Sequence, residues 1–221
     1  MKAQKSIKSF VKRNKRLTSS QKKFLESKNE NSNFHNAIEI LNYHQIFNNS
    51  NPCIMDIGFG DGKLLISIAK ENPEKNFIGV EVYQSGIGRI LKQISKHKLS
   101  NLVVFNHDAV DLLENYIENS SLFGISLFFP DPWPKKKHHK RRIINTNFIN
   151  LISLKLKKRG FIKIATDWSN YSNSIIDLFN QNDNFERIND ISLYKFRHLT
   201  KFEKRGMLLG HQISEVCYLL K

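Results

Sequence analysis

Cysteine is scarce in this sequence, with Cys53 and Cys217 as the only two among 221 residues. Neither lies in a Cys-x-x-Cys or Cys/His spacing typical of a metal site, and a disulfide framework needs more cysteines. We therefore expect a reducing, cytoplasmic setting, in which free thiols persist. No stretch approaches the roughly 20 apolar residues of a membrane span, and no apolar run follows the basic N-terminus. A membrane anchor and a signal peptide are thus not expected.

Acidic residues are also few, since 20 Asp and Glu stand against 35 Lys and Arg and give a formal net charge of +15. Such an excess is typical of proteins that bind a polyanion, because each neutralised phosphate releases a counterion. An AT-rich genome would raise the lysine count, but it would not cluster the basic residues. Hydrophobic residues make up 40% of the chain, which is enough for the core of one α/β domain.

The first 28 residues contain no Gly or Pro, and Glu26 is their only acid beside ten Lys and Arg. This composition predicts a basic N-terminal arm over 1–33, flexible when free. The remaining residues, 34–221, are expected to form the globular domain.

Short apolar runs alternate with helical patterns from residue 36 onward. An amphipathic helix is expected over 36–47, and a loop around residues 200–203. Further helices are expected at 63–70, 87–96, 110–117, 147–156 and around 175–179, and strands at 53–57, 77–80, 102–105, 125–129, 161–165 and 213–220. The alternation predicts an α/β fold with a mostly parallel sheet and helices on both faces. Ligands of such sheets bind beyond the carboxyl ends of the strands.

The first of these strands runs into Gly58, Gly60 and Gly62, with Asp56 two residues before the first glycine. Alternate glycines permit a tight turn and close approach of a ligand to the backbone. A dinucleotide site or a plain turn is the alternative, but the dinucleotide fingerprint is Gly-x-Gly-x-x-Gly. The spacing here resembles the first motif of Rossmann-like methyltransferases, and this resemblance implies their fold, with a mostly parallel sheet of seven strands and helices on both faces.

Acids also follow the next two strands, at Glu81 and Asp108. A carboxylate after the second strand can accept both ribose hydroxyls, and an acid after the third commonly faces adenine in that methyltransferase class. A lone acid at a strand end is more often solvated or a helix cap. Three acids at one level beside a glycine turn favour a shared site.

The fourth strand is followed by Pro130-Asp131-Pro132-Trp133-Pro134, in which prolines stiffen the loop. Asp131 could accept hydrogen bonds from the N1 and N2 edge of guanine, or serve the loop itself as a cap. Trp133 could stack on a base, although packing is the commoner role of a tryptophan.

A basic run over 135–142 comes next and contains two adjacent histidines. Its place beside Asp131 favours phosphate contacts over a merely solvated charge run or a localisation signal. The histidines have no acidic or cysteine partner nearby, so no metal site is expected.

Together these residues resemble the bacterial tRNA (guanine-N7-)-methyltransferases over most of the chain. The most specific strings are Phe-Phe-Pro-Asp-Pro-Trp, ending at Trp133, and Thr-Lys-Phe-Glu-x-Arg-Gly, beginning at Thr200. The resemblance also includes Ser9-Phe10-Val11 in the arm and Ala165-Thr166-Asp167-Trp168. The family often has Glu where Asp56 stands, so that a contact through water is expected there.

The resemblance implies methyl transfer from S-adenosylmethionine to N7 of guanine 46 in the variable loop of tRNA. The residues that it implies for the methyl donor are Asp56, Gly58, Gly60, Glu81, Asp108 and Asp131. The residues that it implies for the tRNA are Lys135, Asp167, Thr200, Lys201, Phe202 and Glu203. Asp131 is expected to orient the guanine, because N7 has a free lone pair and needs little proton transfer. We expect a monomer or homodimer without an obligatory protein partner.

Two other functions remain open on the sequence. Asp131-Pro132-Trp133 is faintly similar to the Asp-Pro-Pro-Tyr loop of amino-group methyltransferases, but the second proline is missing. The chain could also bind RNA around a vestigial pocket, although the glycines and the strand-end acids argue against this. Lys201 could pair with Glu203 at the surface instead of contacting the tRNA.

Overall fold

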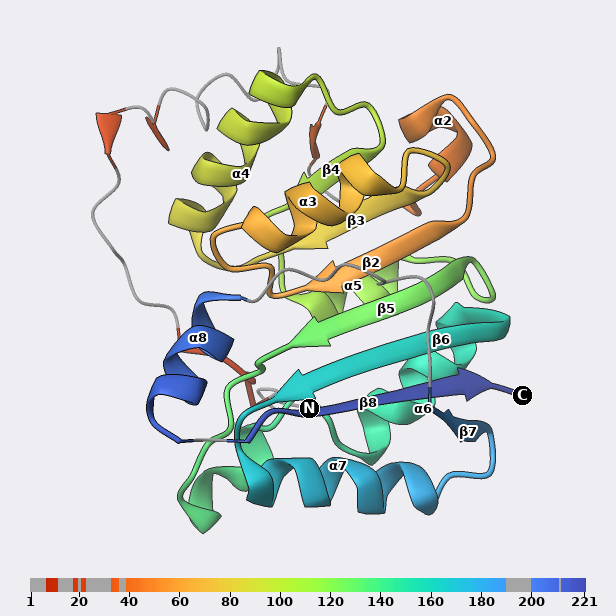
Figure 1. Cartoon of the computed structure of the whole chain (residues 1–221). Helices are drawn as coiled ribbons and strands as arrows, with labels where there is room; N and C mark the ends of the chain where they lie inside the picture. Colours follow the sequence, from red (N-terminus) through yellow and green to blue (C-terminus); the bar gives the residue numbers. More distant parts are fainter. Residues whose placement is uncertain are drawn as a thin grey trace, which may run out of the picture.

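The computed structural model describes residues 7–11, 18–19, 21–22, 33–35, 39–189, 200–210 and 212–221. Its strands are β1 (Phe34–His35), β2 (Cys53–Ile57), β3 (Asn76–Val80), β4 (Leu102–Phe105), β5 (Leu122–Phe128), β6 (Leu156–Thr166), β7 (Phe185–Ile188) and β8 (Ser214–Leu220). Within the described residues they form one sheet of eight strands in the order β1-β4-β3-β2-β5-β6-β8-β7 (Figure 1).

The sheet is parallel from β1 to β6, and β8 lies antiparallel between β6 and β7. The predicted α/β class with a mostly parallel sheet is therefore confirmed. Six of the strands were located in the sequence, β7 is a seventh that was not, and the two-residue β1 adds an eighth at one edge. Every residue of β2, β3 and β4 is buried, as is usual where helices cover both faces of a parallel sheet.

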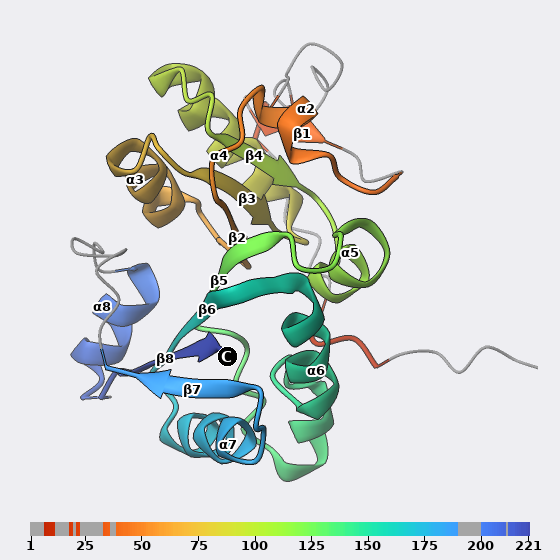
Figure 2. The same ribbon diagram turned by 90° about the vertical axis from the view of Figure 1, so that its right-hand side faces the viewer.

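Helices cover the two faces of the sheet (Figure 2). The helices are α2 (Tyr43–Phe47), α3 (Lys63–Glu71), α4 (Gln84–His97), α5 (Ala109–Tyr116), the 3₁₀ helix η1 (Lys136–Arg141), α6 (Thr146–Lys155), α7 (Ser169–Asn180) and α8 (Lys201–Leu208). One hydrophobic cluster joins α3 and α4 to the sheet, and a second joins α5, α6 and α7 to it. Successive residues of β2, Ile54 and Met55, belong to different clusters, because side chains alternate between the faces of a strand.

The predicted helix over 36–47 is confirmed only at its end, because α2 begins at Tyr43 and residues 39–42 are not helical. Residues 36–38 of the predicted helix lie outside the described residues. The backbone N–H of Leu41 donates to the carbonyl of Tyr116 at 2.8 Å, which holds the chain away from a helical path. The Asn42 side chain then accepts from the N–H of Gln45 at 3.1 Å and caps the short helix.

The order of the strands reverses between β2 and β5. The chain proceeds from β2 through β3 to β4 on one side, and from β5 to β6 on the other. Such a switch point opens a crevice at the carboxyl ends of the strands, where α/β proteins bind ligands. In Figure 1 the arrowheads of β2, β5 and β6 point toward the edge where α8 lies.

Candidate active site

Two side chains meet directly across the switch point. Asp56 of β2 lies opposite Ser126 of β5 in the sheet register, and the Ser126 hydroxyl donates to Asp56 Oδ2 at 2.6 Å. Asp56 is 5% exposed, and burial raises its pKa to about 7, with a further contribution from the nearby negative charge of Glu81. The site therefore holds a carboxyl group that changes its charge close to neutral pH. No pattern in the sequence pointed to Ser126.

The turn after β2 has the left-handed backbone that its glycines suggested. Gly58, Gly60 and Gly62 have φ values of 74°, 61° and 76°. The N–H of Gly58 donates to the carbonyl of Val80 at 2.8 Å, which ties the turn to the end of β3. No atom lies within 4 Å of a Cβ placed on Gly58 or Gly60, so the outer side of the turn is open to a ligand.

Glu81 connects this turn to the neighbouring strand. One carboxylate oxygen accepts from the N–H of Gly60 at 2.9 Å, and the other accepts from the N–H groups of Val82 and Tyr83 at 2.8 and 3.0 Å. Burial raises the pKa of Glu81, these three N–H groups lower it, and the charge of Asp131 raises it again. The charges of Asp56 and Glu81 therefore influence each other, as do those of Glu81 and Asp131, so the three acids lie near one another at this edge of the sheet.

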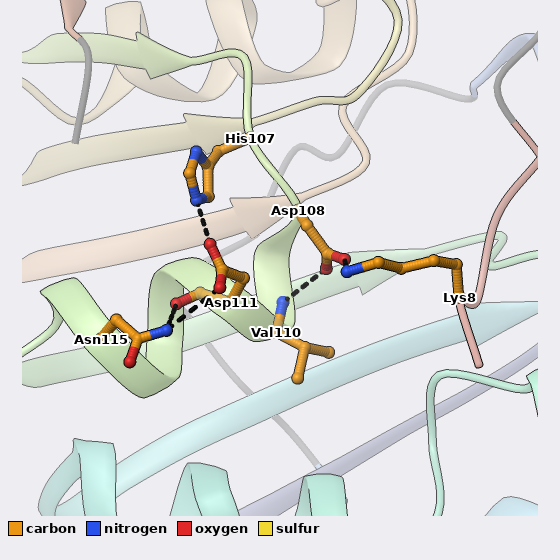
Figure 3. Close-up of polar contacts among 6 residues, drawn as sticks. All are labelled: Lys8, His107, Asp108, Val110, Asp111 and Asn115. Atoms are coloured by element: carbon orange, nitrogen blue, oxygen red, sulfur yellow. Dashed lines mark hydrogen bonds and ion pairs between the residues drawn. The ribbon is translucent and has the colours of Figure 1, made fainter. Parts of the chain in front are cut away.

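Asp108 has two partners at the end of β4 (Figure 3). Its Oδ1 accepts from the N–H of Val110 at 3.1 Å and caps α5, while its Oδ2 accepts from the ammonium of Lys8 at 2.7 Å. Asp108 is therefore a helix cap, which was the alternative role for this residue. Capping the helix does not prevent Asp108 from binding a ligand. Behind the cap, His107 pairs with Asp111, and the Asn115 side chain donates to Asp111 Oδ1 at 3.0 Å.

Residues 7–11 of the basic arm lie against this edge of the sheet. The Ser9 carbonyl accepts from the Trp133 indole N–H at 3.0 Å, and the Val11 carbonyl accepts from the Tyr83 hydroxyl at 2.8 Å. Residues 7–11 therefore contact the segments that follow β3, β4 and β5. The sequence suggested a nucleic-acid contact for the arm but no contact with the acids of the site.

The loop after β5 turns sharply at both ends, at Phe129 with φ 55° and at Trp133 with φ 46°. The left-handed backbone at Phe129 ends β5 at Phe128, one residue earlier than predicted. Asp131 between these turns is exposed. Trp133 packs edge-on against His138. The guanidinium carbon of Arg141 lies over the Trp133 ring, 4.8 Å from the centroid of that ring. Packing is thus its observed role.

The basic run divides into exposed and buried residues. Four lysines are exposed, and the two histidines and Arg141 are partly exposed. The exposed lysines are Lys135, Lys136, Lys137 and Lys140. Arg142, at the end of the run, is 5% exposed and makes its contacts inside the protein. The sequence did not separate Arg142 from its neighbours.

The expected loop at residues 200–203 is wrong, because Thr200 caps the helix α8. The Thr200 hydroxyl accepts from the N–H of Glu203 at 3.0 Å, and Glu203 Oε2 accepts from the N–H of Thr200 at 2.7 Å. This reciprocal pair is a capping box, and its Thr-x-x-Glu signature was present in the sequence. Glu203 is 1% exposed, so it does not lie at the surface, where pairing with Lys201 was the alternative. The side chains of Lys201 and Phe202 lie outside the described residues.

Asp167 follows β6 and lies against α8. A Cβ placed on Gly206 would stand 3.1 Å from Asp167 Oδ2 and 3.2 Å from its Cβ, so the helix approaches Asp167 closely. The structure thereby brings Asp167 and the cap of α8 to the same edge of the sheet as the acids. It does not leave the side chains of Thr200 and Glu203 available at a surface, because both residues take part in the capping box.

Two kinds of feature are absent from the described part of the chain. It contains no group of three or more His, Cys, Asp or Glu side chains that could hold a metal ion. It also contains no helix that is long and apolar enough to cross a membrane.

Comparisons with known proteins agree on one kind of enzyme. The family model described as a putative methyltransferase matches residues 50–216. Among curated proteins, the tRNA (guanine-N(7)-)-methyltransferase of Francisella philomiragia is 40% identical over 96% of this chain and 94% of its own length. The protein of the same name from Shewanella amazonensis is 41% identical over 96% of this chain and 91% of its own length.

Solved structures agree on the fold at low sequence identity. The 16S rRNA methyltransferase KamB matches with a TM-score of 0.58 and 12% identity, over 83% of this chain and 95% of its own. The aminoglycoside resistance methyltransferase NpmB1 matches with a TM-score of 0.54 and 13% identity, over 81% and 92%. The expected Rossmann-like methyltransferase architecture is confirmed by these neighbours.

Proposed function

This chain belongs to the tRNA (guanine-N(7)-)-methyltransferase family, and from that premise we propose that it methylates N7 of guanine 46 in the variable loop of tRNA. The observation that carries the proposal is the cluster of Asp56, Glu81 and Asp131 beside a glycine turn at the switch between β2 and β5. S-adenosylmethionine supplies the methyl group as a sulfonium donor.

The residues at the switch point fit such a donor chemically. Asp56, when ionised, offers a buried carboxylate to the methionine amine, and Glu81 retains lone pairs for the ribose hydroxyls while it orders the turn. Asp108 lies on the same edge and can accept from the adenine amine. Gly58 and Gly60 leave the open space that a close-fitting ligand needs. No residue in this set requires a metal ion.

Asp131 is the proposed catalytic residue. Its exposed position lets the carboxylate accept from the N1 and N2 edge of a guanine. Attack by the N7 lone pair leaves the base with a positive charge, which a nearby carboxylate stabilises. Asp131 therefore orients the base and stabilises charge rather than removing a proton.

The tRNA would lie over the basic surface beside this loop. Lys135 and the exposed lysines of η1 offer phosphate contacts, and the basic arm adds further positive charge to this surface. Asp167 is only partly buried and can reach a nucleotide, whereas Thr200 and Glu203 contribute by fixing α8 and the Lys201–Phe202 segment. We place the reaction in the cytoplasm, with a monomer or homodimer as the working form.

The test is to incubate the purified protein with S-adenosylmethionine and tRNA and to identify the modified nucleoside by mass spectrometry. We expect N7-methylguanosine, with product lost in a tRNA that carries adenine at position 46. Asp131→Ala should lower kcat by roughly a hundredfold, because the base is no longer oriented. Methylation of an exocyclic amine, or tRNA binding without cofactor binding in calorimetry, would overturn the proposal.

A further inference from the structure

Arg142 differs from the rest of the basic run in its environment. It is 5% exposed, and its guanidinium carbon lies 4.6 Å from the centroid of the Tyr171 ring. Tyr171 is itself fully buried, and its hydroxyl accepts from the N–H of Ile144 at 3.2 Å. Arg142 thus stacks on a rigid part of the core, where a flexible polyanion has little access.

Two nitrogen atoms of the Arg142 guanidinium, Nε and Nη2, have defined acceptors. Nε donates to the carbonyl of Pro132 at 3.0 Å, and Nη2 donates to Asn170 Oδ1 at 2.8 Å. Nη2 also lies 3.2 Å from Nε2 of His139, which must be the acceptor because arginine has only donors. The planar guanidinium therefore links the loop after β5 to α7 and to η1.

The Pro132 carbonyl is an informative acceptor because it lies one residue after Asp131. The loop has prolines at 130, 132 and 134, which have no N–H and therefore cannot donate a backbone hydrogen bond that would hold the loop. The start of the loop is fixed by the N–H of Phe129, which donates to the Ala165 carbonyl at 2.8 Å. Arg142 fixes the far side, so Asp131 is held between two backbone anchors.

We propose that Arg142 is a positioning residue that holds the Pro130–Trp133 loop so that Asp131 meets the substrate base, and that it is not a phosphate ligand. The inference rests on the proposed function for its kinetic readout. Lysine cannot replace the arginine, because a single ammonium lacks the planar fork with which the guanidinium reaches both the Pro132 carbonyl and the Asn170 side chain. The charge of residue 142 is therefore less important than its geometry.

The kinetic test compares Arg142→Lys with Lys140→Ala, a change at an exposed residue of the same run. We expect Arg142→Lys to lower kcat by roughly ten- to hundredfold at saturating tRNA, with unchanged cofactor affinity. The slope of log Kd for tRNA against log salt should stay at the parent value for Arg142→Lys, and decrease by roughly 0.7 to 0.9 for Lys140→Ala if that lysine contacts a phosphate. A parental kcat with a reduced salt slope in Arg142→Lys would overturn the proposal.

Chemical rescue provides a second kinetic readout. Arg142 and Asn170 line a groove of about 350 Å³ between η1 and α7, through which a small cation can reach the vacated position. Millimolar guanidinium should restore part of the kcat of Arg142→Ala, and ammonium should not. Equal effects of the two ions would contradict a geometric role. Asn170→Ala, at an exposed residue, should lower kcat in the same direction by a smaller factor and covers the case in which Arg142→Ala does not fold.

A measurement without catalysis separates this inference from the proposed function. Trp133 lies in the loop, and Trp168→Phe leaves it as the only tryptophan of the chain. In that background Arg142→Lys should lower the fluorescence anisotropy of Trp133 and increase its quenching by acrylamide. Unchanged values would refute the positioning role even in an active enzyme, whereas a mobile loop in a protein without N7 transfer would refute only the proposed function.

Discussion

At the scale of single residues, the acids of the site differ in how their charge is compensated. Glu81 accepts three backbone N–H groups, and Asp108 accepts one N–H and the Lys8 ammonium. Asp131 is exposed to water. Asp56 is buried beside one hydroxyl donor and a neighbouring negative charge, so burial disfavours its ionised form and raises its pKa.

The stability of the protein should therefore depend on pH through Asp56. Its pKa is raised from 3.8 to about 7 in the folded state. The folded protein binds a proton that the unfolded chain has lost, so the favourable contribution is complete below pH 4 and disappears as the pH rises to 7. The free energy of unfolding should fall by at most roughly 1.4 kcal/mol per pH unit in this window, relative to Asp56→Asn. Urea unfolding at several pH values measures this, and parallel profiles of the two proteins would contradict it.

The ion pair of Lys8 and Asp108 should compete with the cofactor. The Asp108 hydrogen bond raises the pKa of Lys8, which is half exposed, so the pair is weak. Lys8→Ala frees Asp108 Oδ2 and should tighten binding of S-adenosylmethionine by up to about fivefold, equivalent to roughly 1 kcal/mol. Lys22→Ala, which removes an exposed charge from the same arm, serves as the control in calorimetry. Equal affinities for both variants would show that the pair does not face the cofactor.

At the scale of elements, the glycine turn and α8 show two ways of placing a loop at the edge of the sheet. Gly62 caps α3 with a left-handed backbone, and a Cβ there would stand 2.7 Å from Ile90 Cγ1 in α4. The turn is thus packed against a helix on its inner side and open at Gly58. In α8, the Thr200–Glu203 capping box begins the helix and Gly206 allows it to contact Asp167.

Alanine substitutions should separate strain from packing in the glycine turn. Gly58→Ala and Gly62→Ala both place a side chain at a φ near 75°, which costs roughly 1 to 2 kcal/mol. Gly62→Ala also collides with Ile90 and should cost about 1 to 3 kcal/mol more. Thermal unfolding measures the difference. Gly58→Ala should retain more stability and lose cofactor affinity, because its Cβ fills the open side of the turn. Equal stabilities of the two variants would refute the packing argument.

At the scale of the whole molecule, positive charge and the acidic crevice meet at one edge of the sheet. The net charge is +15, yet the buried acids lie at the carboxyl ends of β2 and β3. The basic arm links the two, since residues 7–11 contact Tyr83, Asp108 and Trp133. The basic surface proposed to attract RNA and the proposed cofactor site therefore lie next to each other.

Two deletions should distinguish the charge of the arm from its contacts. Removal of residues 1–28 takes away ten basic residues together with the contacts of Lys8, Ser9 and Val11. It should weaken tRNA binding and flatten its salt dependence. Removal of residues 1–6 takes away only Lys2 and Lys5 and should flatten the slope by a smaller amount, with cofactor affinity unchanged. Filter binding over a salt series tests both, and identical slopes in all three proteins would exclude the arm as a contact surface.

The sequence by itself determined the core of the fold and the position of the acids at the ends of the strands. Apolar runs such as Cys53–Ile57 became buried strands because a parallel sheet covered on both faces has no polar side. The acids follow directly, since the carboxyl ends of parallel strands lie at one edge. The start of α8 was also readable, because a capping box is local in sequence, although it was predicted as a loop.

Tertiary structure alone decided which charges are compensated. Ser126 lies 70 residues from Asp56, and Lys8 lies 100 residues from Asp108, so no local pattern connects them. Arg142 belongs by sequence to a charged run, and only the fold places it between Pro132 and Tyr171. Periodicity and turn chemistry act between near neighbours, whereas burial and the pairing of charges depend on which distant segments the chain brings together.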